Sequence, residues 1–120
     1  MDSIKTIICD DDQGNLDVLE LLLELDGYRI IKVNDSAKLI EKIREQSPDI
    51  LLVDLWMPMI CGHEIIKIIR KNPELYQLPI IAFSASHDGE QIALGAGADY
   101  YVSKPFDIEE IIEAIKKLLI

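Results

Sequence analysis

The chain has 120 residues, of which 49% are hydrophobic, so it can form the core of one domain, and a disordered chain is excluded. Its formal net charge of −10 argues against nucleic acid as a direct partner, because an acidic surface repels a polyanion. No apolar stretch reaches the ~18 residues of a membrane-spanning helix, and the N-terminus lacks a signal-peptide pattern, so we expect a cytoplasmic protein without membrane insertion.

The first half of the chain alternates short apolar runs with helical patterns. The expected elements are, in chain order, a strand over residues 4–9, a helix whose leucines at positions 16–25 form core, a strand over 28–33, a helix from about residue 35 or 36, and a strand over 50–54. Gly27 ends the first helix, and Pro48 follows the second. Asp12 is expected to face solvent or to cap the first helix.

The second half repeats this alternation. After a loop over residues 55–62, the expected elements are a helix that Asn72 and Pro73 end, a strand over 79–84, a short helix over about 88–95, a strand over 99–103 and a final helix. We expect Asp107 to cap the final helix, with Glu110 as its capping-box partner.

This order of elements predicts the fold class. Continuous apolar strands separated by amphipathic helices predict a parallel sheet with helices on both faces. Five such units are too few for an eight-stranded barrel, so we expect an α/β fold with an open, doubly wound five-stranded sheet in the flavodoxin-like order 2-1-3-4-5. The whole chain, residues 1–120, is expected to be one domain.

Polar side chains follow four of the predicted strands. They are Asp10, Asp11 and Asp12 after the first strand, Asp54 at the end of the third, Ser84 at the end of the fourth and Lys104 after the fifth. In the predicted order the first and third strands are neighbours roughly 4.8 Å apart, so at least two carboxylates of the first loop lie against Asp54. An oxygen-rich cluster of this kind favours Mg²⁺. With a lysine and a hydroxyl alongside, it is suited to phosphoryl transfer, with Asp54 as the nucleophile.

Four motifs fall at these strand ends. They are residues 7–12 (IICDDD), 50–62 (ILLVDLWMPMICG), 82–85 (AFSA) and 100–106 (YYVSKPF). Together, and in this order along the whole chain, they resemble the signature of the response regulator receiver domain of two-component signalling, as in chemotaxis regulators. The resemblance implies a phosphorylation-controlled switch, not an enzyme, that receives its phosphoryl group from a histidine kinase or a histidine phosphotransfer protein.

The resemblance also implies how the acidic residues divide their work. Asp54 is the expected phosphoacceptor. Asp10 and Asp11 are the expected acidic pair, with Asp11 binding Mg²⁺ directly and Asp10 largely through water. The backbone carbonyl of Trp56 is a further expected metal ligand.

Three other residues receive roles through the same resemblance. Ser84 is the expected switch hydroxyl, Lys104 pairs with the phosphoryl group, and Tyr101 is the aromatic residue that turns inward on activation. Lys104–Pro105 resembles the family's cis peptide bond. The downstream protein partner is expected to bind the face formed by the fourth helix, the fifth strand and the fifth helix.

The sequence departs from the family's common pattern in two places. The segment between Ser84 and Lys104 is shorter than usual by about two residues and is rich in glycine, so we expect a shortened or frayed fourth helix on the output face. Trp56 is bulky at a position where smaller or polar residues are frequent. We expect its ring at the rim of the site, where it affects access of water.

Two alternatives from other functional classes remain at this point. The spacing of Asp10 and Asp12 matches the Asp-x-Asp of a haloacid-dehalogenase-like phosphatase, although the chain shows neither the second acidic pair nor the cap insertion of that family. A flavodoxin-like flavin binder fits the fold. Its first loop would have to bind phosphate, however, and three aspartates would repel one.

Overall fold

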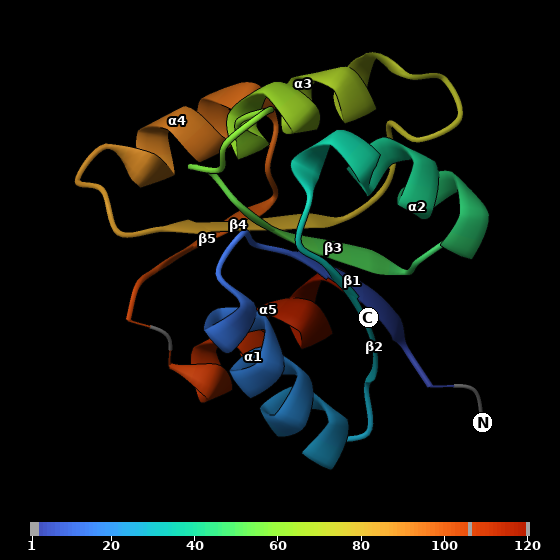
Figure 1. Cartoon of the computed structure of the whole chain (residues 1–120), viewed down its shortest axis with the longest axis vertical. Helices are drawn as coiled ribbons and strands as arrows, with labels where there is room; N and C mark the ends of the chain where they lie inside the picture. The colour runs from blue at the N-terminus through green and yellow to red at the C-terminus, as the bar shows by residue number, and fades with distance from the viewer. Residues whose placement is uncertain (1–2, 106, 120) are drawn as a thin grey trace.

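The five apolar runs form one parallel sheet in the computed structural model, which describes residues 3–105 and 107–119 (Figure 1). The strands are β1 (Lys5–Cys9), β2 (Arg29–Val33), β3 (Ile50–Asp54), β4 (Ile80–Ser84) and β5 (Tyr100–Ser103). They are ordered β2-β1-β3-β4-β5, and every neighbouring pair is parallel. The predicted fold class and strand order are therefore confirmed.

Helices cover both faces of the sheet. They are α1 (Gln13–Leu25), α2 (Leu39–Gln46), which a short 3₁₀ turn η1 (Ser36–Lys38) precedes, α3 (Gly62–Lys71), α4 (Gly89–Ala96) and α5 (Ile108–Leu119). Figure 1 shows α1 and α5 on one face and α2, α3 and α4 on the other. No helix in these ranges is long and apolar enough to cross a membrane.

Two hydrophobic clusters, one on each face, fix the sheet between the helices. Along β3, Leu51 and Val53 pack toward α2 and α3, whereas Ile50 and Leu52 pack toward α1 and α5. This alternation follows from the two-residue period of a strand. Because both faces are covered, every residue of β3 and β4 is buried, and polar groups are available to ligands only at the strand ends.

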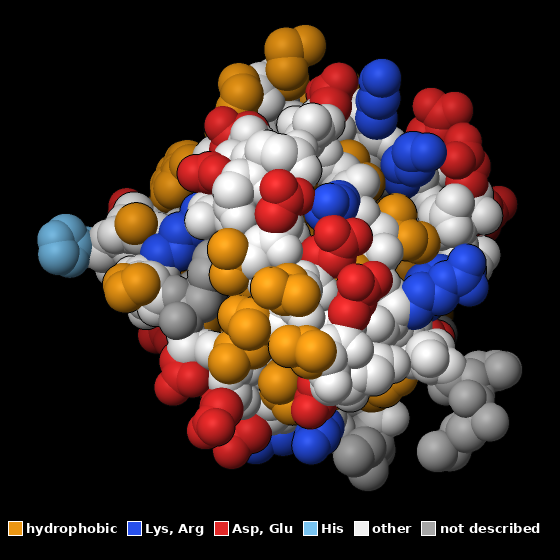
Figure 2. Space-filling model, turned by 60° about the horizontal axis from the view of Figure 1, so that its bottom comes forward, with side chains coloured by type: hydrophobic (Ala, Val, Ile, Leu, Met, Phe, Trp, Pro, Cys, Tyr) orange, Lys and Arg blue, Asp and Glu red, His pale blue; other side chains and the backbone are white. Residues whose placement is uncertain are grey.

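The prediction that all the leucines of α1 form core was wrong for two of them. Leu16, Leu19 and Leu23 are buried, but Leu21 and Leu25 are 61% and 77% exposed. A helix of 3.6 residues per turn presents only one stripe of side chains to the sheet, so leucines outside that stripe point outward. Figure 2 shows exposed hydrophobic side chains gathered among acidic ones on the side of the molecule that carries α1 and α5.

Several predicted element ends are confirmed. Asp12 caps α1 by accepting a hydrogen bond from the Asn15 amide at 3.2 Å, and Asp107 accepts one from the Glu109 amide at 3.0 Å at the start of α5. Helix α4 has eight residues, and Gly97 ends it in the left-handed region at φ 118°. Its expected shortening relative to the family stays a prediction. The Lys104–Pro105 bond is cis, as predicted.

Candidate functional site

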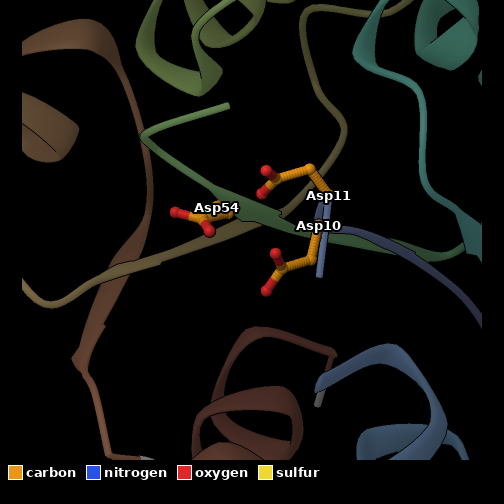
Figure 3. A group of neighbouring side chains, drawn as sticks. All are labelled: Asp10, Asp11 and Asp54. Carbon is orange, nitrogen blue, oxygen red and sulfur yellow. The ribbon is translucent and has the colours of Figure 1, made fainter. Parts of the chain in front are cut away.

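Three carboxylates meet at the carboxyl ends of β1 and β3. These strands are neighbours in register, with Cys9 opposite Val53, so the residues that follow them emerge together. Figure 3 shows the side chains of Asp10, Asp11 and Asp54 side by side. One oxygen of each lies within 4.8 Å of the others. Asp10 and Asp54 are buried and Asp11 is exposed, so the cluster is reachable from solvent on the Asp11 side.

The first loop holds the Asp10 side chain rigidly. Its Oδ1 accepts a hydrogen bond from the backbone amide of Asp12 at 3.0 Å, and its Oδ2 accepts one from the side-chain amide of Asn15 at 3.2 Å. The Asp10 amide in turn donates to the Val33 carbonyl of β2 at 3.2 Å. Contacts to α1 and to β2 thus hold Asp10 in place, although Asp10 itself lies outside any helix or strand.

Lys104 supplies positive charge to this cluster. Its Nζ lies 2.9 Å from Asp54 Oδ2 and 3.4 Å from Asp10 Oδ2, and it approaches the Phe83 ring at 5.3 Å from the centroid. The Lys104 amide donates to the Ser84 carbonyl at 2.9 Å, which fixes the base of the side chain beside β4. One ammonium therefore bridges two of the three carboxylates.

Burial and charge oppose each other at Asp54. Burial raises the pKa of the Asp54 carboxyl above its ordinary value, and the charge of Asp10 adds to this, while Lys104 and a 3.1 Å hydrogen bond from the Trp56 amide offset part of it. For Lys104, burial disfavours the charged form, but its bonds and attraction to Asp54 and Asp10 leave its pKa raised. Burial and the nearby aspartates raise the pKa of the Cys9 thiol to about 12, so this thiol stays neutral.

Ser84 and Tyr101 are joined on the β4–β5 side of the site. Ser84 is buried, and its Oγ lies 2.7 Å from the Tyr101 hydroxyl, which also donates to the Ser84 carbonyl at 3.1 Å. The phenol of β5 therefore contacts the end of β4 directly. The switch roles predicted for both residues stay predictions.

Trp56 lies at the edge of the site, and the residue is 43% exposed. Its indole N–H donates to Ser86 Oγ at 3.0 Å, and its ring packs edge-on against His63 with centroids 5.4 Å apart. The expected position at the rim is therefore seen. The role of its backbone carbonyl as a metal ligand stays a prediction.

Sequence reasoning missed three contributors to the site. Asn15 orients Asp10, and Ser86 bonds both Trp56 and Ser84. Gly62 starts α3 against the end of β3: a side chain there would place its Cβ 2.8 Å from the Asp54 carbonyl carbon and 2.9 Å from Leu55 Cα. Gly62 had a visible signal, as the last residue of the second motif. The hydrogen bonds of Asn15 and Ser86 had none.

Comparison with known proteins agrees with this geometry. The family model of the response regulator receiver domain matches residues 6–116. The polar-differentiation response regulator DivK of Brucella anthropi is 33% identical over 118 residues, which cover 96% of this chain and 95% of that protein. The response regulator signal receiver domain of Bermanella marisrubri superposes with a TM-score of 0.90 at 28% identity, over 99% of this chain and 100% of that one.

A second solved structure bears on the acidic cluster. The receiver domain of the sensor histidine kinase PA1611 of Pseudomonas aeruginosa superposes with a TM-score of 0.90 at 27% identity, over 98% of each chain. That protein has a magnesium ion coordinated in its active-site cleft.

Proposed function

Because the chain belongs to the response regulator receiver domain family, we propose that it is a phosphorylation-controlled switch with Asp54 as its phosphoacceptor. The observation that carries this proposal is the environment of Asp54, which stands between two further carboxylates and the ammonium of Lys104 at the end of β3. The donor would be the phosphohistidine of a histidine kinase or of a phosphotransfer protein. The whole chain would act as one receiver unit in the cytoplasm.

The transfer itself needs little from the protein beyond position and charge. An oxygen of Asp54 forms a bond to phosphorus while the bond from phosphorus to the histidine nitrogen breaks. The electron pair stays on that nitrogen, and a proton from solvent takes the place of the phosphoryl group there. Lys104 is 2.9 Å from an oxygen of Asp54 and would follow the new charge onto the phosphoryl oxygens.

The residues present fit a magnesium ion. Three carboxylates with oxygens within 4.8 Å of one another carry more negative charge than Lys104 balances, and hard oxygen ligands are those that Mg²⁺ prefers. Asp11 and Asp54 would hold it directly, Asp10 largely through water, and the backbone carbonyl of Trp56 would complete the set. When bound, the ion supplies charge neutralisation to the transferring phosphoryl group.

Output would come from the face formed by α4, β5 and α5. A hollow of about 420 Å³ lies on this face, and its lining includes Tyr101, Ser86 and Glu110. Since Tyr101 lines this hollow and also contacts Ser84, a change at Ser84 reaches the surface through one side chain. These contacts support the proposal that the downstream protein binds to this face.

Intact-mass measurement after treatment with a small phosphodonor and Mg²⁺ tests the proposal. The wild-type chain should gain one phosphoryl group and the Asp54→Asn variant none. Asp12→Asn is the matched control, because asparagine also caps helices and leaves α1 intact. If the Asp54→Asn variant is modified as fast as wild type, the assignment of the phosphoacceptor is wrong.

The Asp12→Asn variant also distinguishes the proposed switch from the phosphatase alternative. A haloacid-dehalogenase-like enzyme would use Asp10 and Asp12, so it would hydrolyse a phosphomonoester with turnover and would lose this activity in Asp12→Asn. A flavin binder would be yellow when purified. Against the phosphatase, Asp12 is engaged as the cap of α1.

A further inference from the structure

A buried serine from the β2–α2 connection binds the loop that follows β3. Ser36, the first residue of η1, is 3% exposed. Its hydroxyl donates to the Pro58 carbonyl at 2.9 Å and accepts a hydrogen bond from the Ile60 amide at 3.0 Å. A hydroxyl has one proton and two lone pairs, so this single side chain satisfies both backbone groups. The β2–α2 connection is thereby attached to the tip of the β3–α3 loop, residues 58–60.

The tip of this loop has a backbone conformation that costs free energy. The Ile60 amide also lies 3.0 Å from the Pro58 carbonyl, and Met59 between them has a φ of 72°. This is a three-residue γ-turn with a positive φ at its centre, the rarer and strained form. The Met59 side chain does little to offset the cost by packing, because the residue is 82% exposed. Strain of this kind persists only where surrounding groups impose the conformation, and Ser36 binds both ends of the turn.

The proposed backbone ligand of the metal lies between two attachments of the same loop. At the base of the loop, the Gly62 amide donates to the Leu55 carbonyl at 2.8 Å. At the tip, the hydroxyl of Ser36 holds residues 58–60. Trp56 comes between these two points in the chain, and its amide donates to Asp54 at 3.1 Å. The position of the Trp56 carbonyl therefore depends on both attachments.

We propose that Ser36 is a positioning residue of the magnesium site, which holds the turn at Met59 and so keeps the Trp56 carbonyl in place before the ion binds. The inference rests on the magnesium site of the proposed function. A hollow of about 320 Å³ is lined by Ser36 and Met59 together with Asp11, so the turn adjoins the acidic cluster. A ligand that is already held loses little conformational freedom on binding, which raises the affinity for the ion.

An NMR titration with Mg²⁺, followed by the shifts of backbone amide signals, tests this role. Ser36→Ala should raise the dissociation constant by about two- to tenfold, the effect of one neutral hydrogen bond. Adding Met59→Gly to Ser36→Ala should restore the wild-type affinity, because glycine adopts a positive φ without strain and the turn no longer needs the hydroxyl. Met59→Gly alone should leave the affinity unchanged.

Hydrogen exchange of the Ile60 amide, measured in a chelator, reports on the turn without any metal. The exchange should be about two- to tenfold faster in Ser36→Ala and should return to the wild-type rate with Met59→Gly. Ser47→Gly is the matched control, because Ser47 is the other described non-glycine residue with a positive φ, at 47°. It ends α2 just before β3 begins, at the edge of the sheet away from Asp54. In the Ser36→Ala background, Ser47→Gly should restore neither the affinity nor the exchange rate.

The possible results separate the role of Ser36 from the proposed function. Equal dissociation constants in wild type and Ser36→Ala would overturn the positioning role and leave the magnesium site intact. A loss of affinity that Met59→Gly does not restore, or that Ser47→Gly restores equally, would also overturn it. If wild type binds no Mg²⁺, the magnesium site itself is wrong and the positioning role falls with it, while the exchange of Ile60 would still show whether Ser36 holds the turn.

Discussion

Replacing Asp54 with asparagine removes one negative charge from a cluster in which three carboxylates face one ammonium. The residue Asp54 is 4% exposed, so water screens the interactions of its carboxyl group poorly. Asp10 is fully buried beside it, and the ammonium of Lys104 is 2.9 Å away. The sign of the stability change therefore depends on whether burial and repulsion outweigh the attraction of Lys104.

The magnitudes can be worked from these distances. At an effective dielectric constant of about 20, Asp10 within 4.8 Å repels Asp54 by at least about 3.5 kcal/mol, and Lys104 at 2.9 Å attracts it by about 6 kcal/mol. Burial of the carboxylate costs several kcal/mol more, which turns the balance against the charge. Asparagine keeps one of the two hydrogen bonds from Lys104 and the Trp56 amide, and loss of the other returns about 1 kcal/mol. Asp54→Asn should then stabilise the metal-free domain by on the order of 1 kcal/mol.

Thermal melting in the presence of a chelator measures this change, which corresponds to about 4 °C for a domain of this size. Asp26→Asn, an exposed carboxylate at the end of α1, is the control and should leave the melting temperature unchanged. If Asp54→Asn melts below wild type while the control does not, the attraction of Lys104 outweighs burial and repulsion, and the reasoning fails.

The raised pKa of Asp54 also fixes how the difference depends on pH. The folded state holds the Asp54 proton more tightly than the unfolded state, so acidification through the folded pKa stabilises wild type relative to the variant. The advantage of Asp54→Asn should be complete at neutral pH. It should shrink as the pH falls through the raised pKa and disappear below the ordinary value of about 3.9.

Three further predictions concern the same edge of the sheet. Mg²⁺ at ten times its dissociation constant should stabilise wild type by about 1.4 kcal/mol in thermal melts, and Asp11→Ala should remove this effect. Trp56→Asn should lose its phosphoryl group several-fold faster than wild type after the donor is removed, as followed by intact mass, because the indole shields the site; equal or slower loss would reject the shielding. Gly62→Ala should destabilise the fold by about 1–3 kcal/mol in denaturant titrations, because its Cβ meets the backbone of Asp54, whereas Gly95→Ala should not destabilise it.

The fold was predictable because its signals are local and strong. The strand β3 (Ile50–Asp54) was predicted to the residue, since a continuous apolar run ends at a carboxylate and no helix of five residues would be expected there. The other strands begin one residue later than predicted, at Lys5, Arg29, Ile80 and Tyr100, which is within the ordinary uncertainty of an element's ends. Leu21 and Leu25 were predicted to be buried but are exposed, because residue type alone does not tell on which side of the helix a leucine lies.

The candidate site was predictable as far as strand ends determine it. Once β1 and β3 are neighbours, Asp10, Asp11 and Asp54 have to come together, and the cluster follows from topology alone. The hydrogen bonds of Asn15 and Ser86 depend instead on the directions of individual side chains, which no periodic pattern in the sequence predicts. The roles of all these residues in phosphoryl transfer stay predictions.

The charges of the site explain why an uncharged hydroxyl is needed in the proposed switch. Asp10, Asp11 and Asp54 with Lys104 carry three negative charges and one positive, a sum of −2 that one divalent cation would balance. Phosphorylation replaces the single charge of Asp54 by about −1.5 to −2, so the balance is lost again, while Lys104 is already shared with Asp10. The Ser84 hydroxyl, which lies 2.7 Å from the Tyr101 hydroxyl, can offer a further donor. In the proposed switch, a phosphoryl group on Asp54 would therefore compete with Tyr101 for the Ser84 hydroxyl.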